Sequence, residues 1–426
     1  MTPQVGLSVV CPLLPGHLDQ VRALLNDIGA RPADNEVLPF GRASGVHFGR
    51  LLVLDEATDL GGRPLPAQLL LMADLDGTLD AGLAGLVEAG GAGLDALLGH
   101  CEDYPADASA ASRLAFLRAR SIASDAFYTN TIGRTVGQVR DEARLRDEIE
   151  AHLDGCPELR ALPPREIRDA IREHVRTRPD LAWATEPAVE RDLGWRLRRL
   201  VWLGALPLLV LVVAVALLPL TLAALAAFVI VLRLHELRDP VTRDRPAPEH
   251  LLELAAIEDH GPQNQFSAVG FVKPGLFRRY TARLVLFLTD YGARHLFAHA
   301  NLAGVKTIHF ARWVALDGRR RMIFASSYDG SVESYMDDFI DKVWWGLNAT
   351  FSNGMGYPRT DFLLFHGSRD ELTFKHFLRA HQVPTQVWYS AYDRLTCLNV
   401  ERNARVREGL HGSMGAAEAA RWLALL

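Results

Sequence analysis

Two stretches of this sequence, one near each end, repeat the same pattern and indicate an internal duplication. The tetrad His47-Phe48-Gly49-Arg50 recurs as His309-Phe310-Ala311-Arg312, and each tetrad opens an apolar run. A second apolar run then ends in Asp-Gly, at 76–77 and at 329–330, and Tyr-Pro follows 28 residues after each aspartate. Farther on, residues 116–149 align without a gap to 377–410, with ten identities over 34 positions. A repeat of this length restricts the chain to folds that use one unit twice.

The order of elements is the same in both copies. The apolar runs predict strands, and residues 332–347 place their apolar side chains at the i, i+3, i+4 spacing of a helix that packs on a core. A ferredoxin-like unit has the order strand, helix, strand, strand, helix and a later strand, and each copy follows this order, with the later strand at 386–392 in the second copy. Helices then cover one face of each sheet, and the other face needs a partner. We therefore expect an α+β chain whose two sheets pack together, with units at 1–150 and 262–426 and a helical linker at 151–261.

The linker contains a run of 33 residues without a charge, from Leu200 to Leu232. A straight helix of that length would reach about 50 Å, whereas the hydrocarbon core of a bilayer is about 30 Å thick. Pro219 lies inside the run and predicts a break or kink, because proline removes a backbone donor. The run is therefore expected to contact membrane lipid.

Two membrane topologies are compatible with this run. Arginines flank it evenly, so neither side has the basic excess that marks the cytoplasmic end of a single crossing. One tilted crossing would place the two units on opposite sides of the membrane. A hairpin or re-entrant loop would keep both units in the cytoplasm, where their sheets can meet, and this is the topology we expect. The arginines concerned are Arg191, Arg196, Arg198, Arg199, Arg233, Arg238, Arg243 and Arg245.

Composition excludes several other classes of protein. With 46 basic and 51 acidic residues the net charge is −5, which argues against a nucleic-acid-binding surface. The 4 cysteines are far apart and include no Cys-x-x-Cys, so neither a zinc site nor a disulfide framework is indicated. The sequence also begins without the pattern of a secretory signal peptide.

The residues shared by both copies have two interpretations. Asp76 and Asp329 can accept hydrogen bonds from backbone N–H groups where a helix begins, and His47 and His309 can bond within the sheet. Residues of the second copy alone are better candidates for chemistry. Among these, His381 lies on an apolar helical stripe, where a core histidine is the simpler interpretation.

The paired units and the Asp-Gly at 329–330 resemble the dimeric α+β barrel superfamily, which includes the dye-decolourising peroxidases. Those peroxidases carry Gly-x-x-Asp-Gly, where this chain has Ser326-Ser327-Tyr328-Asp329-Gly330. The resemblance implies a haem cofactor, with Asp329 as the acid–base group for peroxide. The axial ligand would be one of three histidines, and the catalytic candidates come from the tetrad and the Asp-Gly of the second copy. These residues are His366, His381 and His411 as ligands and Asp329, His309 and Arg312 as catalytic groups.

Two functions follow from these expectations. One is a membrane-associated, peroxidase-like haem oxidoreductase that acts on peroxide or an apolar substrate. The alternative is a non-catalytic, membrane-anchored module that binds a lipid or a protein partner. The second copy is richer in aromatic residues, which can line an apolar pocket. We therefore expect any ligand to bind against the second unit, near Asp329 and His309.

Overall fold

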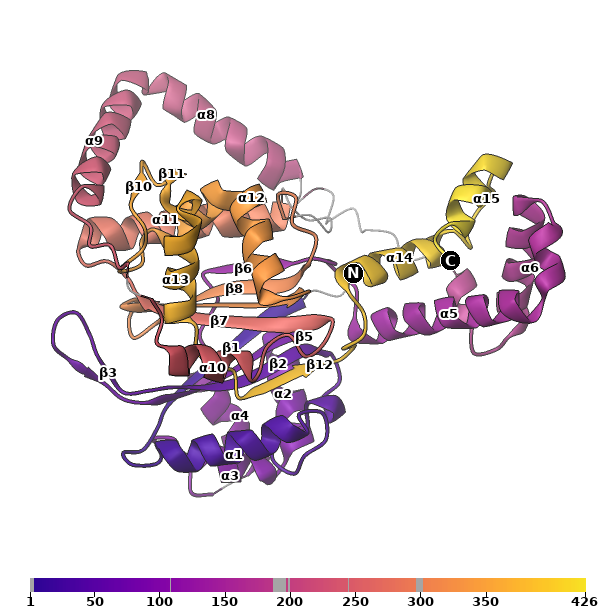
Figure 1. The fold of residues 1–426 in the computed structure, drawn as a ribbon, viewed down its shortest axis with the longest axis horizontal. Helices are drawn as coiled ribbons and strands as arrows, with labels where there is room; N and C mark the ends of the chain where they lie inside the picture. The colour runs from indigo at the N-terminus through magenta and orange to yellow at the C-terminus, as the bar shows by residue number, and fades with distance from the viewer. Residues whose placement is uncertain (1–3, 108, 187–196, 198–199, 244, 296–301) are drawn as a thin grey trace.

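Two antiparallel sheets of four strands each form the centre of the molecule (Figure 1). The computed structural model describes residues 4–107, 109–186, 197, 200–243, 245–295 and 302–426. The first sheet has the order β1-β5-β2-β12, and the second has the order β6-β8-β9-β7. Their strands are β1 (Gln4–Pro12), β5 (Gln68–Asp76), β2 (Val46–Leu54), β12 (Val387–Ser390), β6 (Ala126–Thr129), β8 (Ile308–Leu316), β9 (Arg321–Asp329) and β7 (Gln263–Phe271).

Each sheet takes one edge strand from the opposite half of the sequence. β12 pairs with β2, placing Val387 opposite Leu51. In the second sheet β6 pairs with β8, placing Ala126 opposite Trp313. The expected boundaries near 150 and 262 therefore do not separate two closed sheets, because each half completes the sheet of the other. The strand expected at 386–392 is present but belongs to the first sheet.

The two sheets pack face to face. Leu52 and Met72 of the first sheet form one buried cluster with Val314 and Ile323 of the second. All nine residues of β2 are buried, because the second sheet covers one face and helices cover the other. This double burial explains why the run at 51–54 is continuously apolar instead of alternating.

Helices cover the outer faces, so the layers run helix, sheet, sheet, helix (Figure 1). Buried side chains of α1, α2, α3 and α4 join the first sheet in one core, and those of α11, α12 and α13 join the second in another. Their bounds are α1 (Leu18–Ala30), α2 (Leu79–Gly90), α3 (Gly93–Leu98), α4 (Ala110–Ala119), α11 (Leu276–His295), α12 (Val332–Phe351) and α13 (Glu371–His381). The helix expected over 332–347 is confirmed, with a kink at Val343.

Each Asp-Gly joins a central strand to the helix that follows. Gly77 has φ +83° and Gly330 has φ +86°, a conformation that residues with a side chain rarely adopt. The next residues, Thr78 and Ser331, then accept the backbone N–H three positions later and begin α2 and α12. The two turns therefore use the same local chemistry.

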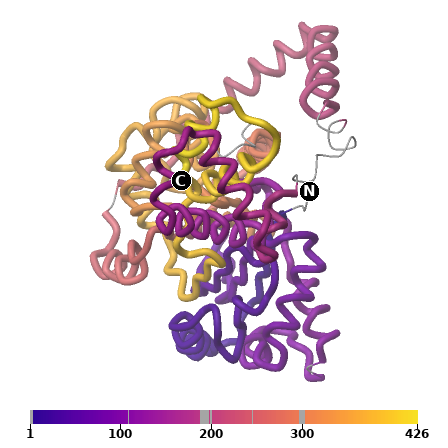
Figure 2. The backbone as a smooth tube through the Cα atoms, turned by 90° about the vertical axis from the view of Figure 1, so that its right-hand side faces the viewer, coloured from indigo at the N-terminus to yellow at the C-terminus, as the bar shows by residue number. Residues whose placement is uncertain are grey.

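A separate helical lobe extends from one side of the layers (Figures 1 and 2). The end of the expected first unit, the expected linker and the end of the chain share its core, which includes Leu145, Ile171, Val406 and Trp422. The linker therefore packs with the C-terminal helices instead of only joining two units. The elements of the lobe are α5 (Val136–Gly155), α6 (Pro164–Thr177), α14 (Cys397–Glu408), α15 (Ala416–Leu423) and two short turns at Pro157–Ala161 and Ala182–Thr185.

Remaining elements are short, apart from an apolar pair of helices. Two small hairpins, β3–β4 and β10–β11, lie outside the main sheets. A turn of π-helix, η4, leads into α8, which is followed by α9 and then by α10. Their bounds are β3 (Ala57–Thr58), β4 (Pro64–Leu65), β10 (Thr360–Asp361), β11 (Phe365–His366), η4 (Val201–Ala205), α8 (Leu206–Ala216), α9 (Leu218–Glu236) and α10 (Pro248–Ala255).

Candidate functional site

A buried histidine–aspartate pair lies on the central strands of the second sheet. His309 occupies a β-bulge between β8 and β9, and its Nε2 donates to Asp329 Oδ1 at 2.7 Å. The other carboxylate oxygen accepts the backbone N–H of Cys397, the first residue of α14, at 2.7 Å. Both oxygens of Asp329 are therefore engaged in joining a strand, a bulge and a helix start.

An equivalent arrangement occurs in the first sheet. His47 lies at a bulge between β2 and β5 and bonds Asp76 at 3.0 Å, and Asp76 accepts the backbone N–H of Val136 at 2.8 Å. Tyr392 adds a hydrogen bond to the other ring nitrogen of His47 at 2.8 Å. The aspartates thus do accept from helix starts, but from α5 and α14 rather than from the helices that follow them in sequence.

The second pair, with a nearby thiol, has the composition of a metal site. Nitrogen, oxygen and sulfur ligand atoms of His309, Asp329 and Cys397 lie within 4.8 Å of one another, and all three residues are buried. Burial and the neighbouring Asp329 raise the pKa of the Cys397 thiol well above its usual value, whereas a metal requires the thiolate. The first sheet keeps the same arrangement with Val136 in place of the cysteine. The geometry therefore favours a structural role for the pair.

The arginine of each repeated tetrad crosses to the opposite sheet. Arg312 donates to Asp74 Oδ1 and to the backbone oxygen of Leu7 in the first sheet. Arg50 reaches the second sheet, where it donates to Ser327 Oγ at 2.9 Å and to Ser267 Oγ at 3.0 Å. Burial lowers the pKa of Arg50 to about 10. Both guanidinium groups hold the sheets together, and the bonds of Arg312 lead away from His309 and Asp329.

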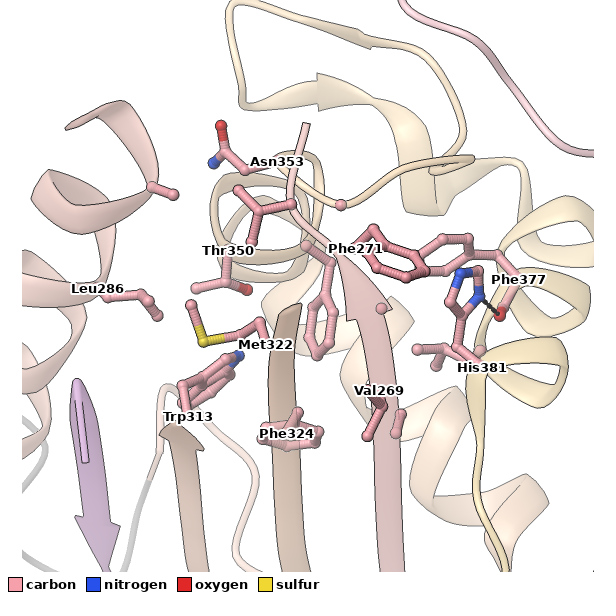
Figure 3. A pocket seen from close by; sticks show the side chains of 17 residues that line it. Val269, Phe271, Leu286, Trp313, Met322, Phe324, Thr350, Asn353, Phe377 and His381 are labelled. Carbon is pink, nitrogen blue, oxygen red and sulfur yellow. Dashed lines mark hydrogen bonds between the residues drawn. The ribbon is translucent and has the colours of Figure 1, made fainter. Parts of the chain in front are cut away.

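An apolar cavity of about 60 Å³ lies on the other face of the second sheet, under α11, α12 and α13 (Figure 3). Its wall includes Trp313, Met322 and Phe324 from the strands and Leu286 from α11. The ligand was expected near Asp329 and His309, and neither of these residues lines this cavity. Those two side chains lie at the end of the sheets where α14 begins.

His381 and Trp313 are two of the polar residues that line this cavity, with Thr350 and Asn353. His381 Nδ1 bonds the Phe377 carbonyl oxygen at 2.8 Å, which fixes Nδ1 as the protonated nitrogen and leaves Nε2 as an acceptor (Figure 3). Burial lowers the pKa of His381, so its ring is neutral near pH 7. The Trp313 indole N–H is buried and has no hydrogen-bond partner among the residues that the structure describes. His381 thus offers an acceptor and Trp313 an unpaired donor.

A larger and more polar groove of about 410 Å³ adjoins the cavity. His381 and Phe271 line both spaces. Arg22, Glu253 and Arg321 contribute charged groups to the groove. An apolar space next to a polar one suits an amphipathic ligand.

The other two histidines expected to bind a cofactor lie elsewhere. His366 is on the β10–β11 hairpin, 74% exposed, and pairs with Asp361 at 2.8 Å. His411 follows α14 in the helical lobe, where its carbonyl oxygen accepts from Arg168. The structure therefore brings neither of them to His381 or to Asp329.

These residues do not fit a haem. The apolar cavity that His381 lines is far below the roughly 300–1,000 Å³ typical of sites for larger ligands. The groove of about 410 Å³ that His381 also lines has the charged Arg22, Glu253 and Arg321 in its wall, whereas the macrocycle of a haem needs apolar faces. Asp329, the expected acid–base group, has both oxygens bonded and lines none of the three main cavities of the described chain.

The uncharged run forms two apolar helices that meet at an angle and project from the layers (Figure 1). The break is at Leu217, two residues before Pro219, and the Thr221 hydroxyl donates to the Ala214 carbonyl oxygen across it at 3.1 Å. Among the described residues, α9 is the one helix whose length and hydropathy would suffice to cross a bilayer. The flanking arginines at 191, 196, 198 and 199 lie outside the described residues.

Both ends of this pair of helices contact α11. Phe277 of α11 packs on Phe228 and stacks on His235 of α9, with ring centroids 5.4 and 5.1 Å apart. At the other end, the Tyr291 hydroxyl donates to the Trp202 carbonyl oxygen of η4. The apolar pair is therefore attached to the same helix that covers the cavity.

Comparison of the chain with protein families, with curated proteins and with solved structures finds no match.

Proposed function

We propose that this protein is a non-catalytic, membrane-anchored module that binds an amphipathic ligand from the bilayer. The observation that carries the proposal is the exposed apolar pair α8–α9, whose two ends are held by α11. The same α11 covers the apolar cavity with Ala282 and Leu286. A membrane anchor and a ligand cavity would thus share one helix.

The body of the module is a tandem duplicate of a ferredoxin-like unit in this proposal. The matched tetrads, bulges, Asp-Gly turns and crossing arginines support it. The exchanged strands β6 and β12 also hold corresponding places at the edges of their sheets. Because each half completes the other, the two halves must stay on the same side of a membrane.

The anchor is a hairpin with its tip at Leu217. At 1.5 Å per residue, the 19 residues of α9 extend about 28 Å, close to the thickness of a hydrocarbon core. Large apolar side chains on both helices of the hairpin are exposed, for example Leu211 of α8 at 59%, and Leu220 and Leu225 of α9 at 66% and 57%. Exposed leucines at this density are costly in water and favourable in lipid. The hairpin leaves both sheets on one side, which we assign to the cytoplasm.

The ligand we propose has an aliphatic chain and a polar head. The small cavity accepts a slender chain rather than a planar ring system, and the adjoining groove has charged groups for a head. The free Trp313 N–H can donate to an acceptor on the ligand, since an unpaired buried donor gains from such a partner.

Membrane anchoring is tested by flotation of the full chain with phospholipid vesicles. We expect the parent to float, and a variant with Leu211→Arg and Leu220→Arg to stay at the bottom of the gradient. Leu252→Arg and Leu398→Arg are the controls, because these leucines are 72% and 57% exposed but lie outside the hairpin. If the hairpin variant floats as the parent does, the anchor is wrongly assigned.

Ligand binding is tested with a fluorescent fatty acid and the detergent-solubilised chain. Ala282→Phe should fill the cavity and abolish saturable binding, whereas Ala424→Phe, at the chain end outside the cavity, should not. Equal binding by both variants would contradict the cavity assignment.

A further inference from the structure

Helix α11 exposes a continuous apolar stripe on its outer face. Exposure is 70% for Leu276, 66% for Tyr280, 50% for Leu284, 58% for Phe287 and 55% for Leu288. At 3.6 residues per turn, these positions fall on one side of the helix. Single exposed apolar residues are ordinary, but a full-length stripe on one helix indicates a contact surface.

The opposite side of α11 is already in use. Ala282, Leu286 and Ala293 are buried against the second sheet and its helices. A different side of α11 therefore already packs on the core, and the helix is apolar on two opposite sides. One side packs on the protein, and the other needs a different environment.

The hairpin contacts lie on the exposed side of α11. Phe277, Tyr291 and His295 fall in the same helical sector as the stripe, near its two ends, and Trp202 stacks on His295 with ring centroids 5.7 Å apart. Figure 1 shows α8, α9 and α11 as three sides of one frame, with α11 as the side that lies on the body. The apolar surface of the hairpin thus continues along α11.

Two arginines border the stripe. Arg279 and Arg283 are both exposed and lie one turn apart, on the flank next to Leu276 and Phe287. Neither forms an ion pair with any residue that the structure describes. A helix with an apolar face and basic residues along its border is the pattern of segments that lie in a membrane interface.

The tip of the β10–β11 hairpin extends the same surface beside α9. Phe362 and Phe365 are 44% and 53% exposed there. Phe362 and Leu363 have φ of +55° and +62°, and their backbone N–H groups both donate to Glu236, the last residue of α9, at 2.8 Å. Such conformations in bulky residues are strained, and the buried carboxylate keeps the phenylalanines turned outward.

We propose that α11 lies parallel to the membrane, with its stripe at the boundary of headgroups and acyl chains and with Arg279 and Arg283 bound to the phosphates of anionic lipids. This rests on the proposed membrane anchoring. The hairpin inserts into the hydrocarbon core, and α11 sets the orientation of the body at the membrane surface. The cavity beneath α11 then lies directly under the lipid.

The test is a depth measurement with single fluorescent labels on the full chain in vesicles. Leu284→Cys reports on α11, Leu211→Cys on the hairpin and Leu398→Cys on a solvent-exposed control. Each is labelled in a chain whose Cys156 is replaced by serine, because the other cysteines are buried. Quenchers dissolved in lipid and in water then place each label.

We expect lipid quenching at 211 and 284 and water quenching at 398, in vesicles that contain anionic lipid. The double substitution Arg279→Gln and Arg283→Gln should lower the partition coefficient of α11 between the membrane interface and water, measured at position 284, by about 25-fold, because each arginine contributes roughly fivefold. Lipid quenching at 211 with water quenching at 284 would overturn the inference and leave the anchor intact. Water quenching at both would overturn the anchor itself. Protection at 284 that rises with protein concentration in detergent without vesicles would assign the face to a second copy and overturn the inference.

Discussion

We expect the buried ion pair between Arg312 and Asp74 to stabilise the interface between the two sheets. Arg312 is 3% exposed and Asp74 is 2% exposed. At the matching place Arg50 finds serine hydroxyls and backbone oxygens, with Ser327 where the other site has Asp74. Of the two guanidinium groups that come from the repeated tetrads, Arg312 is the one paired directly with a carboxylate across the interface.

Asp74→Ser would make the two sites alike and leave Arg312 without its carboxylate. Removing one partner of a buried ion pair costs about 3–5 kcal/mol, because the remaining charge stays desolvated. At roughly 2–4 °C per kcal/mol, the melting temperature should fall by about 6–20 °C. Adding Ser327→Asp to this variant should restore part of the loss, since it supplies a carboxylate to the neighbouring Arg50.

The assay is thermal unfolding of detergent-solubilised parent and variants, followed by near-ultraviolet circular dichroism. Asp80→Ser is the control, because Asp80 pairs with Arg118 at 2.8 Å on the surface, with side chains 69% and 54% exposed. Such a surface pair contributes about 0–1 kcal/mol. If Asp74→Ser unfolds within about 1 kcal/mol of Asp80→Ser, the interface does not depend on this pair and the reasoning is refuted.

Three further predictions concern the expected site residues. Haemin added to the chain should give no Soret band beyond that of free haemin, and a band that His381→Ala removes would contradict this. Burial lowers the pKa of His381 below its usual value of 6.5, so the buried neutral ring stabilises the fold above pH 6.5, and this contribution is lost as the pH falls through the lower pKa of the folded state. The difference in free energy of unfolding between the parent and His381→Leu should therefore shrink between about pH 7.5 and pH 5. A difference that stays constant over this range would contradict the prediction. Cys397→Val, which copies Val136 of the first sheet, should change stability by less than about 1 kcal/mol and leave Co²⁺ absorption absent, whereas loss of a cobalt band in that variant alone would identify a metal site.

Much of the secondary structure was predictable because it depends on neighbouring residues. Apolar runs predicted β8 and β9, the i, i+3, i+4 spacing predicted α12, and the helix break occurs within two residues of Pro219. The repeated tetrads also identified both crossing arginines and both bulged histidines as special positions. Their pattern could not say whether these residues catalyse or hold the fold.

The tertiary structure alone decided where the edge strands and the candidate ligands go. The short strands β6 and β12 could pair locally with either sheet, because an edge strand carries the same alternation whichever partner it meets. None of His366, His381 and His411 stands in a specific motif, and they lie on an exposed hairpin, at a cavity and in a helical lobe. Sequence patterns report the spacing of side chains along one element, whereas a site forms from distant segments whose distances are set only when the sheets, helices and exchanged strands pack together.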